Sequence, residues 1–217
     1  MHNVFVDFET TSLDPWKGDI LTGHMILTDD NYEIKDELEI RIKPSPNTEW
    51  SEESALIHGI DRKATSDWNT RLRVCGELLQ WFSQNLEADY TQNKLIMMAN
   101  PNGWWSEGVY HIPWFDWNFL FSMYWKENLM FALQKYFTQQ SCETLWYKAK
   151  QHKIKPNLKD ISEYLGVQLD HHDAKSDTYA LYECWKTLTR ERYRKTDSSV
   201  SNYQGDLLLE ESHYRSI

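Results

Sequence analysis

The segment Val4-Phe5-Val6-Asp7-Phe8-Glu9 places two carboxylates inside a run of β-branched and aromatic side chains. Such a run predicts a buried strand, and side chains two apart on a strand leave the same face. A D-x-E pair usually lies on a solvated strand edge, but the apolar neighbours argue against that here. Two buried carboxylates side by side are costly unless something neutralises them. Hard divalent cations take oxygen ligands, so the segment predicts a strand that carries a metal site.

A second acidic element, His171-His172-Asp173-Ala174-Lys175-Ser176-Asp177, ends a loop and opens a helix. Asp177 lies about one turn into that helix, on the same face as the small residue Ala174. We expect Asp173 to cap the helix rather than to bind a metal. His172 precedes the helix, where it can overhang the same site as Asp177. A lone histidine in such a place is more often a surface residue, but this spacing from an inward-facing aspartate is unusual.

The order of the predicted elements indicates an α/β fold built on a mixed sheet. Strands are expected at residues 4–8, 25–28, 37–42 and 94–99, and residues 100–113, rich in Trp, Gly and Pro, are expected to form a loop. Helical patterns occupy residues 69–86, 116–126, 143–152, 158–165 and 173–190. We therefore expect one domain, residues 1–195, followed by a C-terminal tail, residues 196–217.

Composition narrows the class of protein. Hydrophobic residues make up 41% and charged residues 26% of the 217 positions, which is typical of soluble globular chains. No apolar run is long enough to cross a bilayer and the start does not resemble a signal peptide, so we expect a cytoplasmic protein without a membrane partner. Cys75, Cys142 and Cys184 are sparse and widely spaced, which favours reduced thiols. The net charge of −10 argues against a large duplex-binding surface, but not against carboxylates that hold cations.

Both acidic elements resemble motifs of one enzyme family. Residues 5–14, FVDFETTSLD, are similar to the first motif of the DEDDh exonucleases, which include proofreading subunits and RNase T. Residues 172–177 match the H-x-A-x-x-D pattern of that family's third motif, and residues 158–167 resemble the stretch that leads into it. Residues 55–60, ALIHGI, resemble the short helix and turn that members often carry after the third strand. The likeness covers residues 3–188.

The second motif of the family matches less closely. Members often carry an aspartate soon after the fourth strand, but position 104 is Trp104 here. Asp116, in Trp114-Phe115-Asp116, keeps an F-D-x-x-F-L pattern at a predicted helix start, which implies an inserted loop over residues 101–113. Asp89 is the other candidate, but it precedes the strand and no helix follows it. We favour Asp116.

The resemblance implies an RNase H-like mixed five-stranded sheet with helices on both faces, and a 3′→5′ exonuclease activity. Asp7, Glu9, Asp116 and Asp177 would hold two divalent cations, Mg²⁺ or Mn²⁺. His172 would be the general base, and the products would be nucleoside 5′-monophosphates. By the same resemblance, Thr10 and Leu13 contact the terminal nucleotide of a single-stranded or 3′-ended nucleic acid.

The inserted loop leaves two interpretations open. Trp104, Trp105 and Trp114 would lie beside Asp116, where they can stack unpaired bases, or the loop can pack on its own aromatic side chains.

Other functions also remain open. The expected substrate is single-stranded DNA, with an exoribonuclease or oligoribonuclease that trims RNA as the main alternative, because the motifs do not distinguish the two. An RNase H-like endonuclease or integrase would not call for His172. A non-catalytic binding or decoy module is disfavoured because all five site residues are present.

Overall fold

The structure, a computed structural model, describes residues 1–99, 104–106, 109–111 and 114–197. Its strands are β1 (His2–Thr10), β2 (Ile20–Thr28), β3 (Ile34–Lys43), β4 (Asn69–Thr70), β5 (Asn93–Met97), β6 (Trp104–Ser106), β7 (Val109–His111) and β8 (Cys142–Thr144). Its helices are α1 (Glu52–His58), α2 (Arg71–Asn85), α3 (Phe115–Lys126), α4 (Met130–Leu133), α5 (Leu145–Gln151), α6 (Leu158–Leu165) and α7 (Ala174–Asp197). Short 3-10 helices are η1 (Arg62–Thr65), η2 (Tyr90–Gln92) and η3 (Gln139–Ser141). No helix among these residues is long and apolar enough to span a membrane.

One mixed sheet forms the centre of the molecule, with strand order β4-β3-β2-β1-β5-β8. β1, β2 and β3 form an antiparallel meander, and β5 and β8 run parallel to β1 on its other side. The expected α/β architecture is confirmed, but the expectation of five strands was wrong. The described part of this sheet has six, because the two-residue β4 pairs with the end of β3. Such a short pairing leaves no periodic pattern in a sequence.

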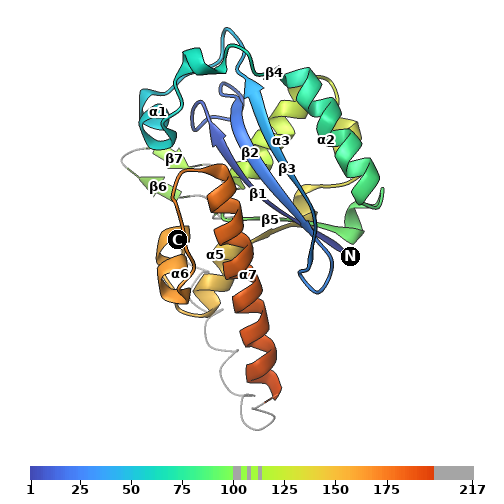
Figure 1. Cartoon of the computed structure of the whole chain (residues 1–217), viewed down its shortest axis with the longest axis vertical. Helices are drawn as coiled ribbons and strands as arrows, with labels where there is room; N and C mark the ends of the chain where they lie inside the picture. The colour runs from blue at the N-terminus through green and yellow to red at the C-terminus, as the bar shows by residue number, and fades with distance from the viewer. Residues whose placement is uncertain (100–103, 107–108, 112–113, 198–217) are drawn as a thin grey trace, which may run out of the picture.

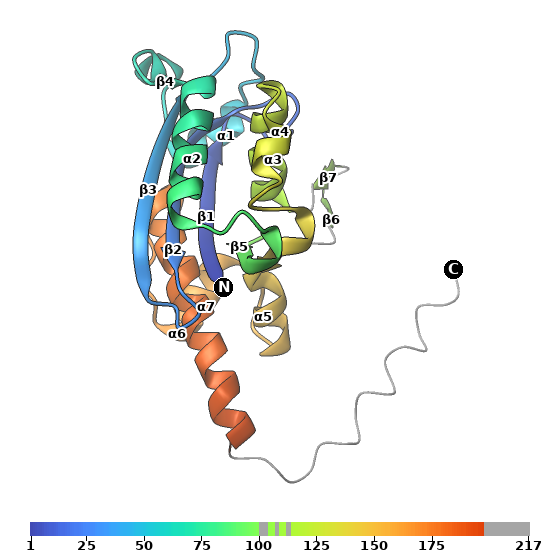
Figure 2. The same cartoon turned by 90° about the vertical axis from the view of Figure 1, so that its right-hand side faces the viewer.

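Helices cover both faces of the sheet, and each face has its own hydrophobic core (Figures 1 and 2). The first core lies between the sheet and the helices α2 and α3, and includes Val6, Phe82 and Leu120. The second lies between the sheet and the helices α5, α6 and α7, and includes Phe5, Leu145 and Trp185. The sheet is therefore buried on both sides, as apolar strands such as β1 and β5 require.

Several local predictions can be compared with this structure. The loop expected over residues 100–113 contains a hairpin, in which β6 pairs antiparallel with β7. The helix expected to end near residue 190 continues to Asp197, so the expected tail at 196–217 overlaps its last two residues and otherwise lies outside the described residues. α1 ends at Gly59, whose left-handed φ of 69° forms the turn that the sequence resemblance implied. All three cysteines are buried and free.

The alternation along β1 separates its apolar residues from its acidic ones. Val4, Val6 and Phe8 belong to the first core, whereas Phe5 belongs to the second. Asp7 and Glu9 share the face of Phe5, because they follow it at intervals of two. The same strand therefore anchors the sheet in both cores and presents its carboxylates on the side that α7 covers.

An opening at the end of β5 exposes these carboxylates. β1 pairs with β5 from His2 to Phe5, and β5 ends at Met97, whereas β1 continues to Thr10. Asp7 and Glu9 therefore lie beyond this parallel pairing, at the carboxyl ends of the two strands. Such ends are the usual place for ligand sites in sheets of this kind.

Gly23 on β2 provides a test of the packing behind the acidic strand. It pairs with Phe8, and a Cβ added at Gly23 would lie 2.4 Å from Cδ1 of that ring. We expect Gly23→Ala to lower the free energy of unfolding by about 1–3 kcal/mol, because the ring must move within a filled core. Urea denaturation measures the change. Gly76→Ala is the control, since nothing lies within 4 Å of a Cβ at that helical position and alanine should stabilise α2 slightly. Equal effects of the two substitutions would contradict this packing.

Candidate active site

A cavity of about 690 Å³ opens where β1 extends past β5. Its ionisable lining consists of four carboxylates and two histidines, from Asp7, Glu9, Asp116, Asp177, His171 and His172. The rest of its wall is mostly apolar and is lined by Phe8, Met98, Ala99, Phe115, Trp146, Pro156, Asn157 and Leu158. Segments that are far apart in the sequence thus contribute to one site.

The carboxylates converge from three elements. Asp7 and Glu9 come from β1, and Asp177 comes from the first turn of α7. One oxygen from each of these three residues lies within 4.8 Å of the others. Asp116 is in the first turn of α3, is only 5% exposed, and lies close enough to raise the pKa of both Asp7 and Glu9. All four aspartate and glutamate residues that the sequence predicted as ligands are therefore together.

The electrostatics of this cluster favour the binding of positive charge. Burial and the neighbouring carboxylates raise the pKa of Asp7 well above its usual range and that of Glu9 to about 8. Burial likewise raises the pKa of Asp116 to about 7 and that of Asp177 above its ordinary value. Asp7 and Glu9 reach the cavity and are half-exposed there, but protein atoms enclose them elsewhere. The raised pKa values show that these carboxyl groups do not all ionise readily side by side. Divalent cations would neutralise their charge and prefer such oxygen ligands.

The chain before α7 positions the Asp177 carboxylate. The backbone N–H of His172 donates to its Oδ2 at 3.1 Å, and Nδ1 of His171 lies 3.3 Å from the same oxygen. The two imidazole rings stack on each other, with their centroids 3.9 Å apart. Asp173 caps α7 as predicted, because its Oδ2 accepts from the Ser176 N–H at 3.0 Å. The sequence does not predict the contact of His171 with Asp177, because this contact depends on the loop conformation.

His172 projects toward the carboxylates from a constrained backbone. Its φ of 73° lies in the left-handed region, which non-glycine residues rarely adopt and which often marks a functional site. Partial burial and the adjacent His171 lower the pKa of His172 below its ordinary value, although the Asp177 carboxylate opposes the change. The lowered pKa favours the neutral imidazole near physiological pH, which is the form that can accept a proton.

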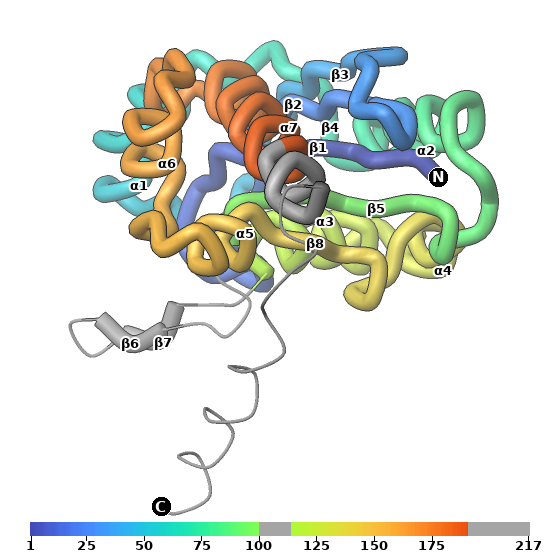
Figure 3. The backbone as a smooth tube through the Cα atoms, turned by 90° about the horizontal axis from the view of Figure 1, so that it is seen from below, coloured from blue at the N-terminus to red at the C-terminus, as the bar shows by residue number. Residues whose placement is uncertain are grey.

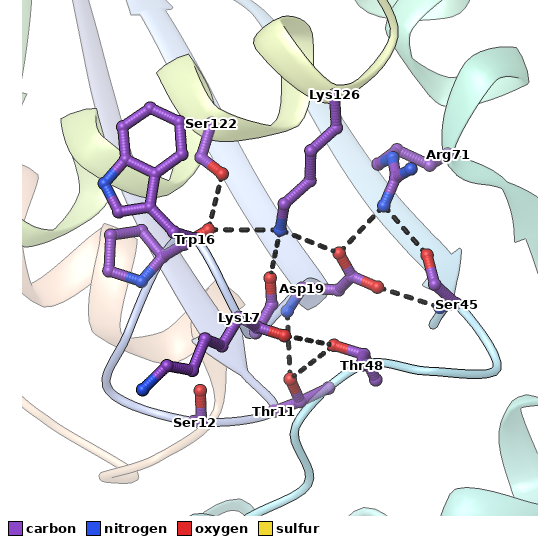
Figure 4. Close-up of polar contacts among 12 residues, drawn as sticks. Thr11, Ser12, Trp16, Lys17, Asp19, Ser45, Thr48, Arg71, Ser122 and Lys126 are labelled. Atoms are coloured by element: carbon purple, nitrogen blue, oxygen red, sulfur yellow. Dashed lines mark hydrogen bonds and ion pairs between the residues drawn. The ribbon is translucent and has the colours of Figure 1, made fainter.

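The loop after β1 is held by a buried ion network (Figure 4). Asp19 is only 5% exposed. Its carboxylate accepts hydrogen bonds from Arg71 Nη1 at 2.9 Å, from Lys126 Nζ at 3.2 Å and from the Ser45 N–H at 2.8 Å. Burial alone would raise the pKa of Asp19, but these donors outweigh it and hold the pKa below its ordinary value. Because Lys126 ends α3 and Asp116 lies in its first turn, the network joins this loop to the helix that carries a site carboxylate.

The predicted nucleotide contacts occupy different positions. The Thr10 side chain is buried and donates to the Ser12 carbonyl at 2.9 Å, whereas Leu13 is 51% exposed on the loop. Neither is among the described residues that line the cavity. Trp114 is half-buried and packs against the first core, and the side chains of Trp104 and Trp105 lie outside the described part of the structure. The proposed contacts of these five residues stay predictions.

The structure also distinguishes the two candidates for the second motif. Asp116 lies in the cavity, whereas Asp89 caps the short helix η2 by accepting from the Thr91 N–H at 2.9 Å, on the exposed surface. The apolar wall of the cavity, including Trp146 on α5, was not predicted from the sequence. The only feature of the sequence that points to Trp146 is its position close to the lysines that precede the third motif.

Comparison with known proteins gives a consistent result. The RNase T-type family model, described as exonuclease, matches residues 4–184. The zinc-bound E. coli exonuclease I in complex with single-stranded DNA matches with a TM-score of 0.68 and 17% identity, over 91% of this chain and 42% of that one. A 3′-exonuclease solved for its 3′-end-specific recognition of a histone mRNA stem-loop has a TM-score of 0.64 and 15% identity, over 88% of this chain and 82% of its own.

A third similar structure is exonuclease I from Methylocaldum szegediense, with a TM-score of 0.65 and 15% identity over 89% of this chain and 41% of that one. This chain thus spans less than half the length of the exonuclease I chains. At such identities the structural matches show the fold. No curated protein sequence matches the chain.

Proposed function

The chain belongs to the DEDDh family of 3′→5′ exonucleases, and we propose that it hydrolyses nucleic acid from the 3′ end to nucleoside 5′-monophosphates. One observation carries the proposal. Four carboxylates and a histidine, from β1, α3, α7 and the loop before α7, line a single cavity. These are the five residues at the positions of the family's motifs. A non-catalytic module would not need to keep this arrangement.

Asp7, Glu9, Asp116 and Asp177 are proposed to hold two divalent cations, Mg²⁺ or Mn²⁺. The fit rests on their hard oxygen donors, on the 4.8 Å clustering of three of them, and on their raised pKa values. When bound, such cations stabilise the attacking and leaving oxygens of an in-line phosphoryl displacement. The His172 N–H and the His171 ring keep the Asp177 carboxylate oriented for this role.

His172 is proposed to act as the general base, taking a proton from the attacking water. Its lowered pKa keeps the imidazole able to accept that proton near neutral pH. The stacked His171 ring limits the orientations that the His172 ring can adopt. The apolar wall of the cavity, including Phe115 and Trp146, offers surfaces on which a base can pack.

We propose single-stranded DNA as the substrate and RNA as the second candidate. A similar structure contains single-stranded DNA, and another is a 3′-exonuclease that recognises a histone mRNA stem-loop. The second match extends over 82% of its own chain, which makes RNA a specific alternative. Either substrate presents a free 3′ end to the cavity.

The direct test uses 5′-labelled single-stranded DNA and RNA of equal length, with Mg²⁺, Mn²⁺ or EDTA. We expect a ladder that shortens from the 3′ end with either metal and no shortening in EDTA. The faster ladder identifies the substrate class. A ladder that persists in EDTA would refute the metal requirement, and no shortening on either strand by the folded protein would refute the activity.

A further inference from the structure

Residues 145–159 form an unusually basic segment of an acidic chain. This stretch, here called the lysine segment, contains five lysines and no aspartate or glutamate, although the whole chain has a net charge of −10. The lysines are Lys148, Lys150, Lys153, Lys155 and Lys159. The segment comprises α5, the turn after it, and the start of α6. Its charge is therefore concentrated in one part of the fold.

The lysine segment also builds one wall of the cavity that holds the carboxylates. Four of its residues line that cavity, namely Trp146, Pro156, Asn157 and Leu158. These side chains carry no charge, whereas Asp7 and Asp116 contribute carboxylates to the same cavity. The helices α5, α6 and α7 pack together on one face of the sheet (Figures 1 and 3). The lysine segment and the carboxylates therefore border the same cavity.

Four of the five lysines are exposed beside that wall. Lys150, Lys153, Lys155 and Lys159 are exposed, and Lys155 pairs with Asp160 at 2.8 Å, with 76% of its side chain still in contact with solvent. Lys148 is different, because it is partly buried, contacts the Thr189 hydroxyl and lies over the Trp185 ring. The exposed lysines are thus the ones available to an external anion.

An aromatic side chain accompanies these cations. Trp146 is half-buried, faces the cavity and has Lys150 Nζ 4.3 Å from its ring centroid. Tyr147 packs edge-on against it, with the ring centroids 5.4 Å apart. Aromatic rings that stack on bases, beside cations that meet phosphates, are the usual means of holding single-stranded nucleic acid.

We propose that the lysine segment binds the phosphodiester backbone of a single strand on the 5′ side of the scissile bond, with Trp146 stacking on one of its bases. The inference rests on the proposed exonuclease function and specifies its substrate as a strand of several nucleotides. The negative cluster repels the backbone unless cations are bound there, so the adjacent lysines supply attraction that the site itself lacks. Affinity gained from phosphates releases counterions and therefore falls as salt rises.

The test compares the Lys150→Gln/Lys153→Gln/Lys159→Gln variant with the wild-type protein on two substrates. One is a labelled single-stranded DNA of about twenty nucleotides, and the other is the p-nitrophenyl ester of thymidine 5′-monophosphate, which has no upstream phosphate. We expect the KM for the strand to rise about tenfold at low salt. In a plot of log KM against the logarithm of the salt concentration, we expect the slope to fall by about two. The rate on the ester should stay within twofold.

A matched variant, Lys35→Gln/Lys43→Gln/Lys135→Gln, removes the same charge from exposed lysines outside the lysine segment. It should change the salt slope by much less. If the two triple variants have the same KM and slope for the strand, the lysine segment is not the binding surface. Trp146→Ala should weaken strand binding by about fivefold or more, and unchanged binding would overturn its stacking role.

Failure of this proposal can be told from failure of the proposed function. Fluorescence anisotropy of the labelled strand in EDTA measures binding without hydrolysis. Hydrolysis of the ester by the wild type, with equal strand binding by wild type and variant, would overturn the lysine segment alone. If the wild type hydrolyses neither substrate, the exonuclease function fails, while weaker strand binding by the variant would still support the segment as a nucleic-acid surface.

Discussion

Replacing Asp116 by asparagine is expected to remove hydrolysis and also to stabilise the metal-free protein at neutral pH. The activity should fall by about a thousandfold or more, because the stabilisation that bound metals supply is several kcal/mol and each 1.4 kcal/mol is about tenfold in rate. The gain in stability follows from removing one of four clustered carboxylates, since Asp116 raises the pKa of both Asp7 and Glu9. It should be on the order of 2 kcal/mol, since one pKa unit corresponds to about 1.4 kcal/mol and the neighbouring carboxylates share the repulsion.

The pH dependence has a definite sign. Carboxyl groups of the unfolded chain ionise near about pH 4, whereas burial and like charges raise the pKa of Glu9 to about 8 and burial raises that of Asp116 to about 7. The folded state therefore binds more protons than the unfolded state between these values. The contribution of these groups to stability is full below about pH 4 and is lost as the pH rises to about 7 and 8. Asp116→Asn should reduce this loss, and Mg²⁺ should reduce it in the wild type.

Thermal and urea unfolding in EDTA and in Mg²⁺, from about pH 5 to about pH 8.5, measure this linkage alongside the exonuclease assay. Asp89→Asn is the matched control, since Asp89 lies on the surface and caps η2. It should retain hydrolysis and show no gain in stability in EDTA. A loss of hydrolysis in Asp89→Asn with retention in Asp116→Asn would reverse the assignment of the second motif.

Replacing Asp19 by alanine is expected to lower the free energy of unfolding by about 3 kcal/mol. The substitution leaves Arg71 and Lys126, each with only 20% of its side chain exposed, without their shared carboxylate. Removing one partner of a buried ion pair lowers the free energy of unfolding by more than the intact pair contributes to it, because the remaining charges stay desolvated. The Ser45 N–H also loses its acceptor. The loop after β1 and the end of α3 should become less firmly joined.

Asp14→Ala on the same loop is the control, because Lys17 is 67% and Asp14 33% exposed, so their partly solvated pair should contribute about 1 kcal/mol or less. The pKa of Asp19 is lowered in the folded state, so its contribution is present above about pH 4 and is lost as the pH falls through the lowered pKa. Urea titrations at neutral and acidic pH test both statements. Equal destabilisation by the two substitutions at neutral pH would contradict the importance of the network.

The sequence by itself determined the local features of the site. The two-residue period of a strand placed Asp7 and Glu9 on one face, and the turn of a helix placed Asp177 and Ala174 together. The family's motif spacing identified His172, and the pattern around Phe115 and Asp116 identified the carboxylate after the insertion. The structure places the site residues around one cavity, while their roles stay predictions. The sequence could group them because each pattern depends on residues within a few positions of one another, where backbone geometry is nearly independent of the rest of the chain.

Only the tertiary structure decided which distant segments meet. The parallel pairing of β1 with β5 stops before Asp7, and that end creates the cavity into which α5 brings Trp146 and the lysine segment. The contact of His171 with Asp177 depends on the left-handed backbone at His172, and the Asp19 network joins residues more than a hundred positions apart. No periodic pattern encodes such contacts, because they form when two cores on opposite faces of the sheet are packed at once.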